Sequence, residues 1–206
     1  MADIIRKSAP RKSALKQTAD QAPSISVNGL SITEYRPQII VQINGATEPS
    51  ALQLALSLTG FNHGQFDSGR AYRREEATVL WNGPGMWMLV CENTSRDSKV
   101  SGIVDQLNTV LQDTDATATD LSHSRTILAM QGENLLDFLY TGCPIDLDKC
   151  PPDSCFSTQF GHFNVMLHLK DSQHANMYVY RSFGQALWNH CQHIVVTLPP
   201  NVARLQ

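Results

Sequence analysis

Residues 120–139 read DLSHSRTILAMQGENLLDFL, and this stretch holds three successive structural signals. Arg125 to Met130 is a run of mostly apolar and β-branched side chains, which predicts a strand. Gln131-Gly132 is typical of a turn. Leucines then fall on one face from Glu133 to Tyr140, which predicts a helix. A strand, a turn and a helix in this order favour a mixed α and β fold.

Further predicted strands and helices lie on both sides of this stretch. Strands are predicted at 39–43, 78–81, 86–90, 116–120, 163–169 and 177–180, with a last short strand or tail at 194–196. Helices are predicted between a cap at Thr47 and a stop at Gly60, at 97–112 and at 182–190. Ser182 and Gln185 have the spacing of a capping box for the last helix. The series strand, helix, two strands, helix, strand occurs twice. It predicts an α+β fold of two ferredoxin-like (split βαβ) plaits that share a core, with halves at about 37–118 and 119–206.

Residues 1–36 have a different composition, dominated by Ala, Ser, Lys, Gln and Thr. Five basic residues lie near its start: Arg6, Lys7, Arg11, Lys12 and Lys16. We expect residues 1–36 to form an extended or disordered basic arm, and residues 37–206 to form a single domain. An arm that docks on a partner is the alternative.

Composition narrows the function classes. The chain has 206 residues, 42% of them hydrophobic, and a net charge of −3, which does not direct it to nucleic acid or to a membrane surface. Apolar runs stay below the roughly 20 residues of a membrane span, and we expect a cytoplasmic protein. Five cysteines, an odd number, are expected to be free thiols.

Motifs with catalytic or ligand-binding chemistry are weak in this sequence. Gly83-Pro84-Gly85 lacks the third glycine of a phosphate-binding loop, so it predicts a hairpin turn. Ser122-His123 has no nucleophile elbow around it, so it predicts the start of a strand. Cys143, Cys150 and Cys155 form no Cys-x-x-Cys pair, and we expect no metal site. We predict no catalytic residue and no cofactor on this chain.

Four segments carry a family resemblance. Residues 120–139 resemble the folate-binding domain of the glycine-cleavage aminomethyltransferase superfamily, in which an Asp-Leu-Ser-His opening leads to a strand, a glycine turn and a helix. Three further segments resemble motifs of sarcosine oxidase gamma subunits: LWNGPGMWML at 80–89, GCPIDL at 142–147 and YVYRSFGQALW at 178–188. The order and spacing agree from about Tyr35 to Trp188. The departures are Asn82, where the family has an apolar residue, and Gly85-Met86, where it has an acidic pair.

This resemblance implies a role. Heterotetrameric sarcosine oxidase oxidatively demethylates sarcosine to glycine and releases hydrogen peroxide, with 5,10-methylenetetrahydrofolate or formaldehyde as the other product. The resemblance implies a non-catalytic gamma-type subunit that packs on the alpha, beta and delta subunits, mainly the large alpha subunit. The FAD, FMN, NAD, zinc and tetrahydrofolate of the complex would then be on other subunits.

Two alternatives remain open. The chain is a stand-alone folate-binding or aminomethyltransferase-like module, for which Asp120 is the candidate pterin ligand, or it is a regulatory protein that acts during cofactor loading. In the leading interpretation the motif residues are structural or lie at the interface. They are Trp81, Gly83, Pro84, Trp87, Asp120, Ser122, His123, Arg125, Gly132, Pro144, Asp146, Arg181, Ser182, Phe183 and Trp188.

Overall fold

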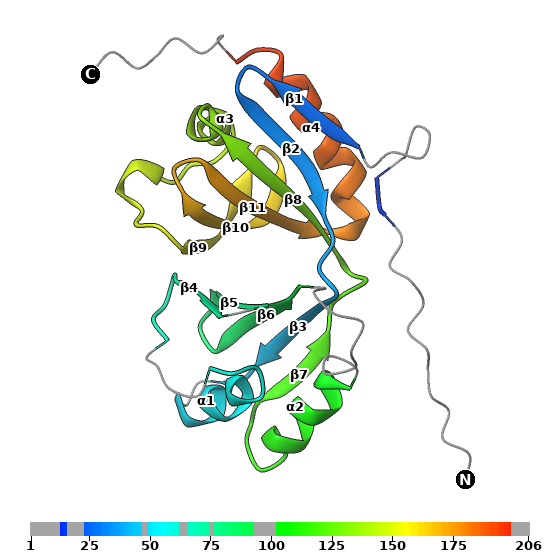
Figure 1. The fold of residues 1–206 in the computed structure, drawn as a ribbon, viewed down its shortest axis with the longest axis vertical. Helices are drawn as coiled ribbons and strands as arrows, with labels where there is room; N and C mark the ends of the chain where they lie inside the picture. Colours follow the sequence, from blue (N-terminus) through cyan, green and yellow to red (C-terminus); the bar gives the residue numbers. More distant parts are fainter. Residues whose placement is uncertain are drawn as a thin grey trace.

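The computed structural model describes residues 13–15, 23–46, 49–61, 66–74, 76–92 and 102–198. They form two antiparallel sheets, which we call sheet A and sheet B (Figure 1). Sheet A contains, in spatial order, β1 (Ser24–Val27), β2 (Leu30–Tyr35), β8 (Arg125–Gly132), β11 (His174–Tyr180), β10 (Phe163–Asp171) and β9 (Ser154–Phe160). Sheet B contains β4 (Ala71–Arg74), β5 (Ala77–Gly83), β6 (Met86–Cys91), β3 (Ile39–Asn44) and β7 (Thr117–Asp120).

The sheets face each other, and helices cover their outer sides (Figure 1). Sheet B carries α1 (Pro49–Ser57) and α2 (Ile103–Leu111), and sheet A carries α3 (Leu135–Tyr140) and α4 (Gly184–Val195). Short 3-10 turns lie at Leu147–Lys149 (η1) and Arg181–Phe183 (η2). None of the helices in the described ranges is long and apolar enough to span a membrane.

The first plait is confirmed. Its elements β3, α1, β5, β6, α2 and β7 follow the predicted series, and the spatial order β5-β6-β3-β7 is that of a ferredoxin-like plait with β4 added at one edge. β3 is buried on both faces, because α1 and α2 cover one side and sheet A covers the other. This explains why its sequence is a continuous β-branched run rather than an alternating one.

The second plait is completed by the N-terminal segment. β8, α3, β10, β11 and α4 occur in this order, with β9 inserted between α3 and β10. The fourth strand position of the plait, beside β8, is filled by β2. The predicted boundary at residue 36 is therefore wrong for residues 24–35, as is the assignment of the second half to 119–206 alone. Ile25, Leu30 and Ile32 alternate with polar residues and are buried, which gives this hairpin its place in the core.

The start of the predicted arm has contacts of its own. Leu15 is buried in the core of sheet A, and Ser13 Oγ donates a hydrogen bond to Glu34 at 2.6 Å. Residues 1–12 and 16–22 lie outside the described residues. The described residues 13–15 and 23–35 are thus part of the folded domain, and the prediction of a separate extended or disordered arm is wrong for them.

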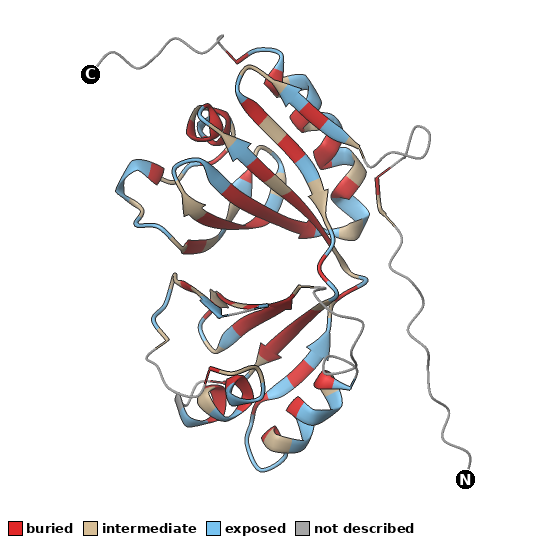
Figure 2. Cartoon of the chain, in the orientation of Figure 1, coloured by how far each residue is buried: buried red, intermediate tan, exposed pale blue. Residues whose placement is uncertain are grey.

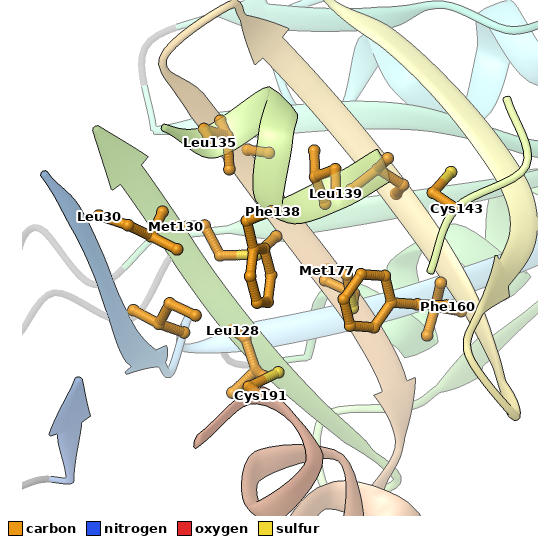
Figure 3. Packing of buried hydrophobic residues seen from close by; sticks show 14 of the residues in the cluster. Leu30, Leu128, Met130, Leu135, Phe138, Leu139, Cys143, Phe160, Met177 and Cys191 are labelled. Atoms are coloured by element: carbon orange, nitrogen blue, oxygen red, sulfur yellow. The ribbon is translucent and has the colours of Figure 1, made fainter. Parts of the chain in front are cut away.

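Buried apolar residues form three clusters. Figure 2 shows the buried residues along the strands of both sheets and on the helices. The cores of the two plaits lie between each sheet and its helices. In sheet A, Phe138 of α3 packs against Phe160 of β9 at a ring-centroid distance of 5.1 Å (Figure 3). A thinner layer, which we call the shared layer, joins the two sheets. It comprises Ile40, Ala71, Leu80, Met88, Val90, Ile127, Cys155, Met166 and Tyr178.

Several local predictions differ from the structure. No strand was predicted at β4 or β9, and Ile194 and Val195 continue α4 rather than form a short strand or a tail. The predicted cap at Ser182 also differs, because the N-cap residue of α4 is Phe183, which makes no side-chain capping hydrogen bond. The start of the helix expected at 97–112 lies outside the described residues up to Ser101.

Candidate functional site

A cleft of about 780 Å3 opens between the two sheets at one end of the shared layer. Polar and apolar side chains from both plaits line it. Its lining residues are Gln42, Asn44, Asn82, Met86, Met88, Leu121, Arg125, Pro144, Ser157, Thr158, Gln159, Asn164, Val165, Met166, Tyr178 and Tyr180. A volume of this size is within the range of small-molecule and peptide sites.

Side-chain amides cross the floor of the cleft. Gln42 Nε2 donates to Asn44 Oδ1 at 3.2 Å, and Asn82 Nδ2 donates to Gln42 Oε1 at 3.1 Å. Ser157 Oγ then donates to Asn82, with its carbonyl oxygen at 3.3 Å and its side-chain oxygen at 3.2 Å. This network links β3 and β5 of sheet B to β9 of sheet A, so it fixes the two walls relative to each other.

Arg125 is the charged residue in the lining. Its guanidinium lies 3.9 Å from the centroid of the Tyr180 ring, a cation–π contact at the mouth of the cleft. The lining formed by the described residues includes no carboxylate and no histidine. Tyr178 lies deeper, and burial raises the pKa of its phenol, so the hydroxyl stays protonated near neutral pH. These groups can orient a ligand by hydrogen bonds, but they contain no pair suited to moving a proton.

The segment from Asp120 to Arg125 passes from sheet B to sheet A. Asp120 is exposed, and its carboxylate accepts hydrogen bonds from the Ser122 amide at 2.8 Å and from Ser122 Oγ at 2.5 Å. Ser122 Oγ also accepts a hydrogen bond from the Ile40 amide at 3.0 Å. Asp120 therefore stabilises the turn that follows β7. His123 is exposed, and the Ser122 hydroxyl hydrogen points to Asp120, so the two residues form no nucleophile and base pair.

Two tryptophans lie in the cores of the plaits, and the third lies next to the shared layer. Trp87 is buried and packs edge-on against Phe66 at a centroid distance of 6.0 Å, and Trp188 is buried in the core of sheet A. Trp81 is half-buried between the core of sheet B and the shared layer. Gly83 and Pro84 form the turn between β5 and β6, as predicted.

The remaining motif residues are mostly exposed. Pro144 lines the cleft, and Asp146 forms an ion pair with Lys149 at 2.6 Å. Arg181 donates to the Ser13 carbonyl at 3.2 Å, and Ser182 and Phe183 are exposed on η2. Phe183 keeps 52% of its surface exposed, although it contacts Phe163 edge-on at 6.4 Å. An exposed aromatic ring of this kind, close to Tyr180 at the mouth of the cleft, is typical of a protein interface.

A polar seam lies on the side of the shared layer where β9 approaches β4, and sequence reasoning missed it. His168 is buried, and its Nε2 lies 3.2 Å from Asp153 Oδ1. His168 Nδ1 and Asn176 Oδ1 have no hydrogen-bond partner among the described residues. Desolvation lowers the pKa of His168, and the neighbouring Asp153 opposes this shift. The signal available in the sequence was a histidine and an asparagine within two otherwise apolar strands.

The cysteines are not arranged for catalysis or metal binding in the described ranges. All five are free thiols, and Cys155 donates from its Sγ to the Trp81 carbonyl at 3.2 Å. Burial raises the pKa of Cys155 to about 12, so the thiolate is not populated near neutral pH. Within the described part of the chain, no group of three or more His, Cys, Asp and Glu side chains is placed to hold a metal ion.

The sequence matches no protein-family model and no curated protein. Solved structures are similar in fold. A chain of heterotetrameric sarcosine oxidase from Corynebacterium sp. U-96 superimposes with a TM-score of 0.68 at 19% identity, covering 84% of this chain and 85% of that one. The glycine cleavage system aminomethyltransferase T from Bartonella henselae gives 0.60 at 13% identity, covering 80% of this chain and 46% of that one. These likenesses show the fold alone: two antiparallel sheets with helices, arranged as in the sarcosine oxidase chain and the aminomethyltransferase.

Proposed function

We propose that this chain is a non-catalytic, gamma-type accessory subunit of a heterotetrameric sarcosine oxidase. Its role is to bind the other subunits, mainly the large one, and to stabilise the assembly. The observation that carries the proposal is the near full-length likeness, over 84% of this chain and 85% of the other, to a chain of such an oxidase.

The geometry of the cleft supports a binding role. Its lining offers amides, hydroxyls, methionines and one arginine, and exposed Tyr180 and Phe183 lie nearby. Tyr, Arg and Phe are enriched where subunits meet. On this proposal the FAD, FMN, NAD, zinc and tetrahydrofolate of the complex are held by the alpha, beta and delta subunits.

The experiment is purification of the chain, tagged at its C-terminus, from its native host grown on sarcosine. We expect yellow, flavin-containing material with three further subunits and sarcosine-dependent peroxide production. A colourless single chain would overturn the proposal. A host culture grown without sarcosine, with the same tagged chain, is the control for non-specific capture.

A folate-binding module is the second candidate, because the cleft is large enough for a small ligand and the aminomethyltransferase is similar in fold. Asp120 does not support it, since its carboxylate is exposed and engaged by Ser122 outside the cleft lining. Folate titration of the isolated chain, followed by tryptophan fluorescence, separates the two. We expect no saturable quenching, whereas saturable quenching that Asp120→Ala abolishes would favour the module.

A further inference from the structure

Three side chains form one row across sheet A, in the polar seam between the two sheets. His168 of β10 is directly opposite Cys155 of β9 on one side and Asn176 of β11 on the other. Side chains at directly opposed positions of antiparallel strands share a face, with Cβ atoms about 4.5–5.5 Å apart. This face is turned to sheet B, because Cys155 belongs to the shared layer. The row is enclosed, since His168 and Asn176 keep only 3% and 5% of their surface exposed.

The ring of His168 presents a hydrogen-bond acceptor inside this seam. Its Nε2 lies 3.2 Å from Asp153 Oδ1, and a carboxylate oxygen accepts hydrogen bonds, so Nε2 carries the proton. Burial lowers the pKa of His168, which keeps the ring neutral near neutral pH. A neutral imidazole has one donor and one acceptor nitrogen, so Nδ1 is the acceptor. Nδ1 is buried and has no partner among the described residues.

Asn176 presents a second buried acceptor next to the first. Its side chain is hydrogen-bonded to the Tyr178 hydroxyl. Its Oδ1 has no partner in the described ranges, so the amide nitrogen makes the bond to Tyr178. Nδ1 of His168 and Oδ1 of Asn176 are both acceptors, and they cannot bond to each other. A donor from elsewhere is therefore needed to satisfy them.

Arg70 adds an unpaired donor to the same seam. Its backbone is bridged to Ser154, the neighbour of Cys155, where sheet B meets β9. Burial raises the pKa of the Cys155 thiol, and the Trp81 carbonyl and the Arg70 guanidinium oppose that shift, so Arg70 lies near the row. Arg70 Nη1 is buried and has no partner among the described residues. The Cys155 thiol does not serve His168, because it donates to the Trp81 carbonyl at 3.2 Å.

These three atoms define the ligand by their chemistry. Two acceptors require a molecule that can donate two hydrogens, and the guanidinium requires a lone pair. Water offers both, and buried waters typically make about three hydrogen bonds. A cation is disfavoured, because the charges of Lys170 and Arg73 already act on the ring of His168. A half-turn of the Asn176 amide would satisfy His168 but would leave Arg70 without a partner.

We propose that the seam binds a water molecule that donates to His168 Nδ1 and Asn176 Oδ1 and accepts from Arg70 Nη1, directly or through a second water. The site joins β10 and β11 of sheet A to the segment that leads into β4 of sheet B. It lies beside Asp153, which bonds through its backbone to both β10 and β4. The water thus adds to the hydrogen bonds that hold the two plaits together at this corner, and this role does not depend on the accessory function.

The tautomer of His168 is the first test, and it needs no substitution. Long-range proton–nitrogen correlation spectra of the isotopically labelled full chain distinguish a protonated from an unprotonated ring nitrogen. We expect a neutral ring near neutral pH, with the proton on Nε2 and none on Nδ1. A proton on Nδ1 would overturn the proposal, because that nitrogen would then donate to Asn176 itself. The exposed ring of His123 is the reference for a solvated histidine.

A high-resolution crystal structure of the full chain tests the ligand itself. We expect one solvent peak within about 2.7–3.2 Å of both His168 Nδ1 and Asn176 Oδ1. No such peak, with direct donation to His168 by Arg70, by Lys170 or by a rotated Asn176 amide, would overturn the bound water.

Two variants locate the water by its magnetic contact with the protein. A buried water stays bound far longer than surface water, so it gives a cross-relaxation signal at the His168 Hε1 proton. Asn176→Leu removes one acceptor at similar volume, and we expect it to abolish this signal. Thr126→Val is the matched control, because it removes a buried hydroxyl on the face of sheet A that meets Gly184 of α4, and the signal should persist. A signal that is missing in the unmodified chain, or unchanged in folded Asn176→Leu, would overturn the proposal.

Discussion

Gly132 ends β8 beside the β1–β2 hairpin, with a φ of +138°. A Cβ at this position would collide with the Gly29 carbonyl oxygen and come within 2.8 Å of the Gly29 carbonyl carbon. We predict that Gly132→Ala lowers the free energy of unfolding by at least about 3 kcal/mol, since backbone strain and backbone collision add. The measurement is urea unfolding.

The matched control is Gly102→Ala. Gly102 has a φ of +85°, but no atom of the described residues lies within 4 Å of a Cβ built there. Conformational strain alone predicts that Gly102→Ala lowers the free energy of unfolding by about 1–2 kcal/mol. Equal losses at the two positions would show that the contact with Gly29 is relieved at no cost, contrary to the prediction.

His168 gives a residue-scale prediction about pH. Burial lowers its pKa in the folded chain below the unfolded value of about 6.5, so the unfolded state binds more protons as the pH falls. The contribution of neutral, buried His168 to the free energy of unfolding is therefore fully present above about pH 6.5 and is lost as the pH falls below that value. We predict that His168→Gln reduces the fall in unfolding free energy between about pH 7.5 and pH 5. Urea unfolding at both pH values tests this, with exposed His123→Gln as control, and an unchanged pH slope would contradict it.

At the scale of elements, the hairpin β1–β2 belongs to the second plait although it precedes the first plait in the chain. Its removal would leave β8 without its outer neighbour and take Leu30 and Ile32 from the core. Each such side chain contributes about 1.5–3 kcal/mol when buried, against a total stability of about 5–15 kcal/mol. We predict that a chain starting at Pro37 does not fold its second plait, whereas one starting at Ser13 melts like the full chain. A melt of the chain starting at Pro37 with the same midpoint and the same circular dichroism change per residue as the full chain would refute this.

Elements whose signal is local were predictable from the sequence. The β-branched run of β3, the turn at Asn82–Gly85 and the leucine face of α3 each carry their own pattern, and the structure confirms all three. β2 was missed because its place is set by pairing with β8, nearly a hundred residues away, and because its polar neighbours resemble a linker. β9 was missed because prolines precede it and its outward edge is polar.

The site was harder to predict than the fold, because its residues come together only through the packing of the two sheets. Gln42 and Asn44 were visible as polar residues on one face of an apolar strand, but nothing local connects them to Ser157. The motif residues were better indicators of architecture. Hydrogen bonds of Asp120 and Ser122 hold the segment that passes from sheet B to sheet A. Gly132 permits the close approach of the β1–β2 hairpin to β8.

At the scale of the whole molecule, the cleft exists only while the thin shared layer holds the two plaits together. Leu80 and Met88 are paired on neighbouring strands of sheet B and face sheet A. Val79 and Leu89, also paired and fully buried, face the helices instead. Replacing either pair by alanine removes comparable apolar volume, at about 2–5 kcal/mol for each residue. The two double variants thus weaken different layers by similar amounts.

We predict that Leu80→Ala with Met88→Ala loosens the contact between the plaits while each plait keeps its own core. Small-angle X-ray scattering, below the melting temperature of each variant, should then show a larger radius of gyration for this pair than for Val79→Ala with Leu89→Ala. The first pair should also lose the partner subunits, because the amide network and the edge of β9 would no longer face each other across one cleft. Equal radii and equal capture would mean instead that the bonds of β9 to Gly69 and Ala71, with the crossing at Asp120–Arg125, hold the plaits in place without the shared layer.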